Sequence, residues 1–73
     1  MDGFEIERSD RVSRSEAATR LRRIATLLSG DDEEIEFERA GMKFKVVVPA
    51  EVEMKVELEL DDEENELEIE LKW

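Results

Sequence analysis

Apolar and charged side chains alternate from Glu34 to the last residue, Trp73. In a β-strand successive side chains point to opposite faces, so this period of two predicts strands with one apolar and one ionic face. The clearest case is the run 66–73, in which Trp73 falls in the apolar phase. Strands buried on both faces would read as continuous apolar runs, so the pattern favours an antiparallel sheet with one face in water.

A single helix is predicted from about Arg14 to Ser29. The segment 13–16, Ser-Arg-Ser-Glu, matches a capping box, in which Ser13 accepts from the amide three residues on and Glu16 reaches back to the cap amide. Gly30 follows at the place where a left-handed helix end favours glycine. The apolar stripe of this helix recurs at helical spacing at Ala17, Leu21, Ile24 and Leu28.

Turn signals divide the rest of the chain into short strands. A short first strand is expected from Phe4, with Phe4 and Ile6 alternating with Glu5 and Glu7, and it should end around Arg8 to Asp10. Arg39-Ala40-Gly41 has the length of a three-residue hairpin loop. Pro49 cannot donate to a ladder, and the acidic turn 61–65 leads into the last strand. We therefore predict one α+β domain over residues 1–73: an antiparallel sheet of about five strands, in the order β-α-β-β-β-β, with one helix packed on its apolar face.

The predicted apolar face is too wide for one helix. A helix of about sixteen residues is about 24 Å long and about 10 Å across, whereas five strands span about 20 Å, so about half of the sheet stays uncovered. A second chain is the simplest cover, and we expect a two-fold homodimer; strong curling of the sheet is the alternative. The candidate interface residues are Met54, Val56, Leu58, Leu60, Leu67, Ile69, Leu71 and Trp73. Trp73 could instead be an exposed anchor for another protein, but its phase favours packing.

The residue inventory gives little support for catalysis. The chain has no His, Cys or Tyr, so no imidazole could activate a serine, and thiolate metal sites and iron-sulfur clusters are excluded. The strand carboxylates point into water, where nothing would raise their pKa values, and the acidic turns 31–34 and 61–65 do not match a calcium-binding loop. We expect neither an enzyme nor a cofactor nor a defined metal site.

Charge leaves two binding alternatives open. The formal net charge is −11, from 22 acidic and 11 basic residues. Arginines nevertheless gather between residues 8 and 23, and they would bind nucleic-acid phosphates if they formed one exposed patch. The opposite alternative is an acidic mimic that occupies the site of a basic partner. The candidate phosphate contacts are Arg14, Arg20, Arg22 and Arg23.

Location is constrained only weakly. The apolar runs are short and the N-terminus is acidic, so neither a signal peptide nor a membrane-spanning helix is expected. The absence of cysteine favours an intracellular, cytoplasmic protein. The acidic side chains behind the net charge of −11 repel one another in dilute salt, and concentrated salt would screen this repulsion.

The chain resembles the amphi-Trp domain family, small acidic proteins mainly of halophilic archaea. The resemblance rests on the order of Phe4-Glu5-Ile6-Glu7, Ser-Arg-Ser-Glu-Ala-Ala at 13–18, the Gly41 hairpin, Val-Pro-Ala-Glu-Val at 48–52, and Glu-Ile-Glu-Leu-Lys-Trp at 68–73. It implies a salt-loaded archaeal cytoplasm and brings no established activity or catalytic residues. We therefore expect a noncatalytic protein–protein interaction or structural module that acts as a homodimer in high salt.

Overall fold

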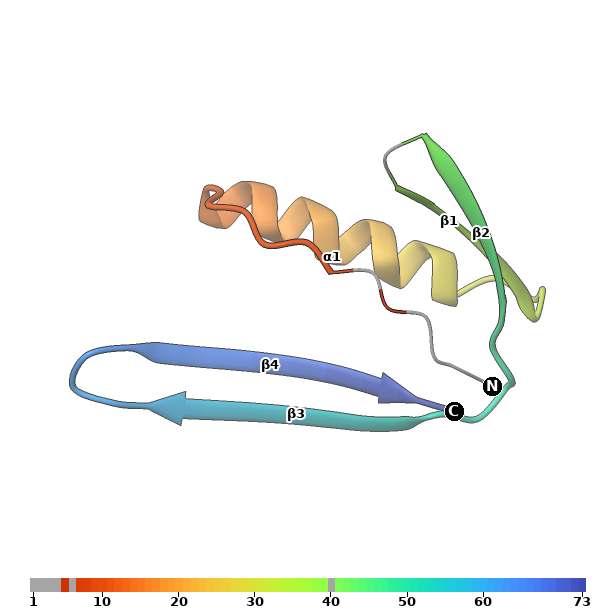
Figure 1. The fold of residues 1–73 in the computed structure, drawn as a ribbon. Helices are drawn as coiled ribbons and strands as arrows, with labels where there is room; N and C mark the ends of the chain where they lie inside the picture. The colour runs from red at the N-terminus through yellow and green to blue at the C-terminus, as the bar shows by residue number, and fades with distance from the viewer. Residues whose placement is uncertain (1–4, 6, 40) are drawn as a thin grey trace.

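One helix is followed by four strands in the computed structural model, which describes residues 5, 7–39 and 41–73 (Figure 1). The elements are α1 (Arg14–Leu28), β1 (Glu34–Arg39), β2 (Met42–Val47), β3 (Glu53–Leu60) and β4 (Asn65–Lys72). The strands form two separate antiparallel hairpins, β1–β2 and β3–β4. The predicted α+β class and antiparallel pairing are thus confirmed.

The N-terminal end of α1 follows the predicted cap. The hydroxyl oxygen of Ser13 accepts a hydrogen bond from the Glu16 amide at 3.0 Å, so Ser13 satisfies one of the free donors of the first turn. The second half of the box does not form, because Oε1 of Glu16 instead accepts from Nε of Arg20, one turn along, at 3.2 Å. The helix ends at Leu28, with Ser29 as its C-cap. Gly30 is not in the left-handed conformation, so that part of the prediction was wrong.

The β1–β2 hairpin has a shorter loop than predicted. Arg39 pairs with Met42, so residues 40 and 41 alone connect the strands. Gly41 has φ +77°, the left-handed value that the turn was expected to require. Ile35 lies opposite Val46 in this register, and Phe37 opposite Phe44, so one face of the hairpin is apolar.

The single five-stranded sheet is not observed, because β2 does not pair with β3. After β2 the amide of Val48 donates to the carbonyl oxygen of Glu33 at 2.7 Å, and Pro49 has no amide to donate. The chain therefore leaves the first hairpin before β3 starts at Glu53. The expected first strand rests on residues 4 and 6, which lie outside the described residues, and Glu5 and Glu7 are not in a strand.

Helix α1 approaches only the first hairpin. It has Cα atoms within 8 Å of β1, whereas no residue of β3 or β4 comes within 8 Å of α1, β1 or β2. In the part of the chain that the structure describes, Ile35 and Val48 are the two buried hydrophobic residues. The core is thus small and lies where β1, the end of β2 and the C-terminal end of α1 meet.

The chain is open for its size. A compact protein of 8.5 kDa exposes about 4,700 Å² of surface, whereas this chain exposes 7186 Å², about 2,500 Å² more. Its radius of gyration, 14.4 Å, also exceeds the value of about 11 Å typical of 73 residues. Many large hydrophobic side chains are exposed, most of them on α1, β3 and β4.

Candidate interaction surfaces

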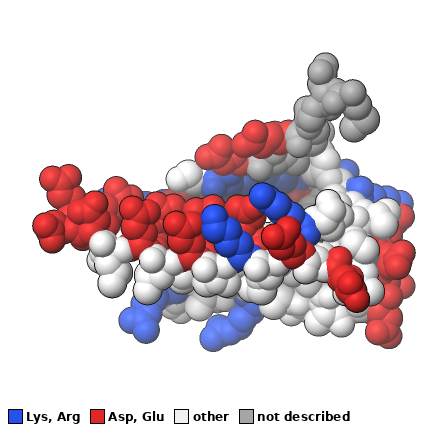
Figure 2. All heavy atoms as spheres, turned by 90° about the horizontal axis from the view of Figure 1, so that it is seen from below, with Lys and Arg blue, Asp and Glu red and all other residues white. Residues whose placement is uncertain are grey.

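The β3–β4 hairpin separates its apolar and ionic side chains completely. Met54 lies opposite Leu71, Val56 opposite Ile69, and the intervening pairs are charged. We call the apolar side of this hairpin the β3–β4 apolar face; it comprises Met54, Val56, Leu58, Leu60, Leu67, Ile69 and Leu71, with Trp73 in the same phase beyond β4. In Figure 2 the arm that extends to the left carries a row of acidic side chains beside a row of uncharged ones.

The β3–β4 apolar face is open to solvent. Seven of its eight residues are exposed by between 45% for Ile69 and 72% for Leu60, and Leu71 is half-buried. These are the residues that the sequence selected as a candidate interface, and the structure brings them together on one side of one hairpin. Large contiguous apolar surfaces of this kind mark interaction sites in soluble proteins. That a second copy of the chain covers these residues remains a prediction.

The exposed side of α1 forms a second uncovered apolar surface. Leu21 and Ile24 belong to the apolar stripe that was expected to pack on the sheet. They are nevertheless 50% and 46% exposed. Beside Ile24 lies an open hollow of about 790 Å³ between α1 and the first hairpin, with Phe37 and Val46 in its lining. Charged residues of the first hairpin also contribute to its lining: Glu38, Arg39, Lys43 and Lys45.

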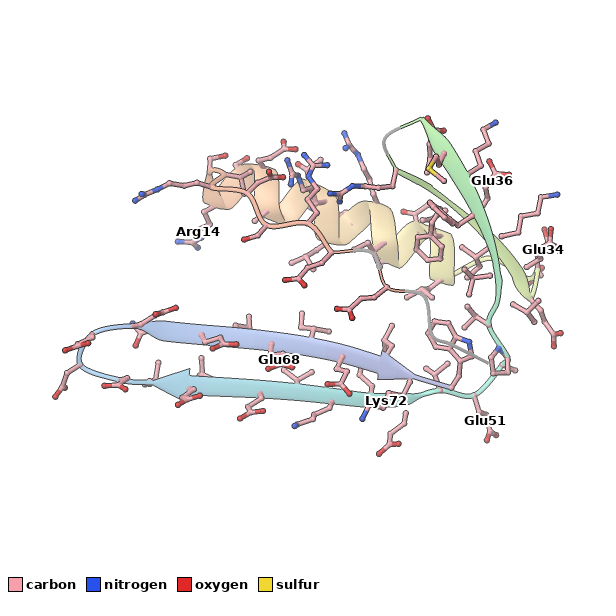
Figure 3. The ribbon with its side chains drawn as sticks, in the orientation of Figure 1. Arg14, Glu34, Glu36, Glu51, Glu68 and Lys72 are labelled. Carbon is pink, nitrogen blue, oxygen red and sulfur yellow. The ribbon has the colours of Figure 1, made fainter. Side chains whose placement is uncertain are left out.

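The ionic faces of the two hairpins differ in how their charges are matched. On β1–β2, Glu36 lies opposite Lys45 and Glu38 opposite Lys43. Figure 3 shows Glu34 and Glu36 projecting away from the helix. Diagonal ion pairs link Lys43 to Glu36 and Lys45 to Glu34, each at 3.8 Å.

On β3–β4 opposite charges face each other at the open end of the hairpin, but like charges face each other nearer the turn. Nζ of Lys72 lies 2.9 Å from Oε1 of Glu70, and this ammonium group lowers the pKa of the Glu70 carboxyl and has its own pKa raised. Nearer the turn, Glu57 lies opposite Glu68 and Glu59 opposite Glu66.

The four arginines that sequence reasoning selected for phosphate contact do not share a face of α1. At about 100° per residue, Arg22, Arg23 and Arg20 lie about 80°, 180° and 240° around the helix axis from Arg14. Figure 3 shows Arg14 at the start of the helix, apart from the rest of the chain. The arrangement does not favour a single phosphate-binding surface.

Arg20 is in addition already engaged by carboxylates. Its Nη1 lies 3.0 Å from Oδ2 of Asp10, and its Nε lies 3.2 Å from Oε1 of Glu16. Arg8 also pairs with Asp10. The hydrogen bond from Arg20, followed by that from Arg8, lowers the pKa of Asp10, and the same carboxylates raise the pKa of Arg20. This cluster joins the segment before the helix to its first turns.

The described residues offer neither a metal site nor a membrane-spanning helix. Within residues 5, 7–39 and 41–73, no three His, Cys, Asp or Glu side chains are grouped so that they could hold a metal ion. None of the helices described is long and apolar enough to cross a membrane.

Comparison with known proteins gives one match. No curated protein and no solved structure matches the chain. The family model for the Amphi-Trp domain matches residues 2–73, which is nearly every residue of the sequence. The amphipathic strands, the helix and the terminal Trp73 described above lie within the matched range. The chain therefore belongs to the Amphi-Trp domain family.

Proposed function

We propose that this Amphi-Trp domain is a noncatalytic protein–protein interaction module that acts as a homodimer, in the cytoplasm and in concentrated salt. The observation that carries the proposal is the β3–β4 apolar face, in which Leu58 is 65% exposed and Leu60 is 72% exposed. A lone hairpin with such a face is marginally stable in water, because it has nothing to bury its apolar side chains against.

The exposed area is of the size that a permanent dimer buries. The surplus of about 2,500 Å² in each chain would give about 5,000 Å² for two chains, the upper part of the range for obligate homodimers. Symmetric dimers are also the commonest closed assembly. A second copy therefore supplies both the area and the apolar character that the open face needs.

The cytoplasm and the high salt are supported by composition. The chain has no cysteine, as is common where thiols are kept reduced, and its net charge of −11 repels itself unless dissolved ions screen it. The noncatalytic assignment is supported by the absence of His, Cys and Tyr from the sequence.

Sedimentation equilibrium in high salt tests the homodimer. We expect a species of about twice the 8.5 kDa chain mass, and Leu58→Glu should shift it to the mass of one chain, because burying a carboxylate in an apolar interface is unfavourable. The matched control is Lys55→Glu, which adds acidic charge to the ionic side of the same strand and should leave the dimer intact. A single species of 8.5 kDa for the unsubstituted protein would contradict the proposal.

A further inference from the structure

We propose that, in the homodimer proposed above, α1 of each copy packs on the β3–β4 apolar face of the other copy, so that the two β3–β4 hairpins do not pack on one another. This inference rests on the proposed homodimer and specifies that the helix of one copy covers the β3–β4 apolar face of the other.

Both surfaces are uncovered within one chain. Leu21 and Ile24 on α1 are about half exposed, and Val56 on the hairpin is 59% exposed. No Cα atom of β3 or β4 lies within 8 Å of α1, so the helix does not cover the hairpin of its own chain. Two apolar surfaces without a partner in the same chain can cover each other in a pair of chains.

Charge favours the helix as the partner of the hairpin. Between residues 53 and 72 there are ten acidic and two basic residues, a net charge of −8, whereas α1 carries four arginines and one glutamate, a net charge of +3. Two hairpins packed face to face through their apolar sides would keep their ionic side chains on the two outer faces, and the apolar side chains of both helices would stay uncovered. A helix against a hairpin brings opposite charges together instead.

The dimensions agree as well. A helix of 15 residues is about 22 Å long, and strands of 8 residues are about 27 Å long. The hollow beside Ile24 adds Phe37 and Val46 to the apolar surface next to the helix. Because each chain offers one helix and one hairpin, the reciprocal contact closes with two-fold symmetry and leaves neither surface open.

Cysteine crosslinking tests this arrangement directly, because the chain has no cysteine of its own. One preparation carries Leu21→Cys on α1, and the other carries Val56→Cys and a size tag. The two are unfolded, mixed, refolded together in high salt and treated with a short bismaleimide, which bridges nearby thiols. We expect a covalent product that contains one chain of each size. The matched control replaces Val56→Cys with Glu57→Cys, one residue along on the ionic face, and should lose the mixed product.

Each other outcome overturns the inference, and sedimentation of the same samples distinguishes the reasons. If Val56→Cys chains crosslink to one another as strongly as to Leu21→Cys chains, the hairpins face each other, and only the homodimer survives. A dimeric sample without mixed product also rejects the helix contact. A further sample carries Leu21→Cys and Val56→Cys in the same chain. If this chain is monomeric, with a mass of 8.5 kDa, and its two cysteines are crosslinked to each other, the helix covers the hairpin of its own chain and the homodimer is overturned too. Leu58→Cys repeats the test in case Val56→Cys does not refold, as judged by circular dichroism.

Discussion

Glu57 of β3 lies directly opposite Glu68 of β4. The next pair towards the turn, Glu59 and Glu66, repeats the arrangement. Among the residues that the structure describes, Glu57 has an ion pair with Lys55 at 3.3 Å, whereas Glu68 has none. Like charges placed directly across an antiparallel pair destabilise it. The middle of this hairpin therefore carries a repulsion that the first hairpin avoids.

Replacing one member of the pair should relieve this repulsion. We expect Glu68→Lys to raise the free energy of unfolding by about 0.5 kcal/mol in dilute salt, because an attractive cross-strand pair replaces a repulsive one. The gain should shrink in molar salt, where the Debye length falls to about 3 Å. Urea denaturation at fixed protein concentration and two salt concentrations measures both effects.

The matched control for this substitution is Glu70→Lys. Glu70 lies opposite Lys55 and pairs with Lys72, so the same change of charge should destabilise the hairpin there. If both substitutions stabilised the protein equally, the effect would come from total charge rather than from the facing glutamates.

The Ser13 cap should contribute measurably to the helix. Ser13→Ala removes the acceptor of the Glu16 amide, and we expect a loss of about 1 kcal/mol in the free energy of unfolding. Ser15→Ala is the control, because Ser15 lies inside the helix, where alanine is favoured. Thermal denaturation followed by circular dichroism compares them; equal losses would show that Ser13 does not act as a cap.

Gly41 should be sensitive to substitution and Gly30 should not. At φ +77° a side chain costs about 1–2 kcal/mol, so Gly41→Ala should lower the free energy of unfolding by that amount. Gly30 has no positive φ, and a Cβ there would meet no atom within 4 Å, so Gly30→Ala should be nearly neutral or slightly stabilising. The same thermal measurement applies, and a neutral Gly41→Ala would contradict the turn geometry.

The Asp10 cluster should make part of the stability depend on pH. The pKa of Asp10 is lowered in the folded chain, so the stability that Asp10 contributes is present above the ordinary aspartate range and is lost as the pH falls through the folded value. Arg20→Gln should raise the pKa of Asp10 towards its ordinary value, and Arg8 should keep part of the shift.

Carboxyl carbon chemical shifts of Asp10, followed by nuclear magnetic resonance, measure this change. Arg23→Gln is the control, since Arg23 forms no ion pair within the described part of the chain and its removal should leave the Asp10 titration unchanged. An unchanged pKa in Arg20→Gln would show that Arg20 does not hold the carboxylate in solution.

Local patterns predicted the elements well and their arrangement less well. The period of two located the four strands after the helix, and Ser13 marked the start of α1 to the residue. Alternation does not say which strands pair, however, and the strands form two separate hairpins instead of the expected single sheet of about five strands. The deciding contact is the hydrogen bond from Val48 to Glu33, which joins residues that no local pattern connects.

The candidate interface could be chosen from sequence because phase alone puts its residues on one face. Which charges face each other across the strands could not be predicted from the sequence, because this depends on the pairing register. A shift of one residue in β4 would place Leu67 opposite Glu57. The spread of the arginines could have been found from helical geometry once the helix bounds were known. The ion pair between Arg20 and Asp10 could not have been found in this way, since Asp10 lies outside the helix.

The small core around Ile35 and Val48 has a consequence for how much of this protein a cell must contain. In the proposed homodimer a second copy would supply most of the apolar contact, so folding and association would become one equilibrium and the folded fraction would fall on dilution. Abundance then acts as a structural variable: a chain made at too low a level would lose its fold, with no change in sequence, temperature or solvent.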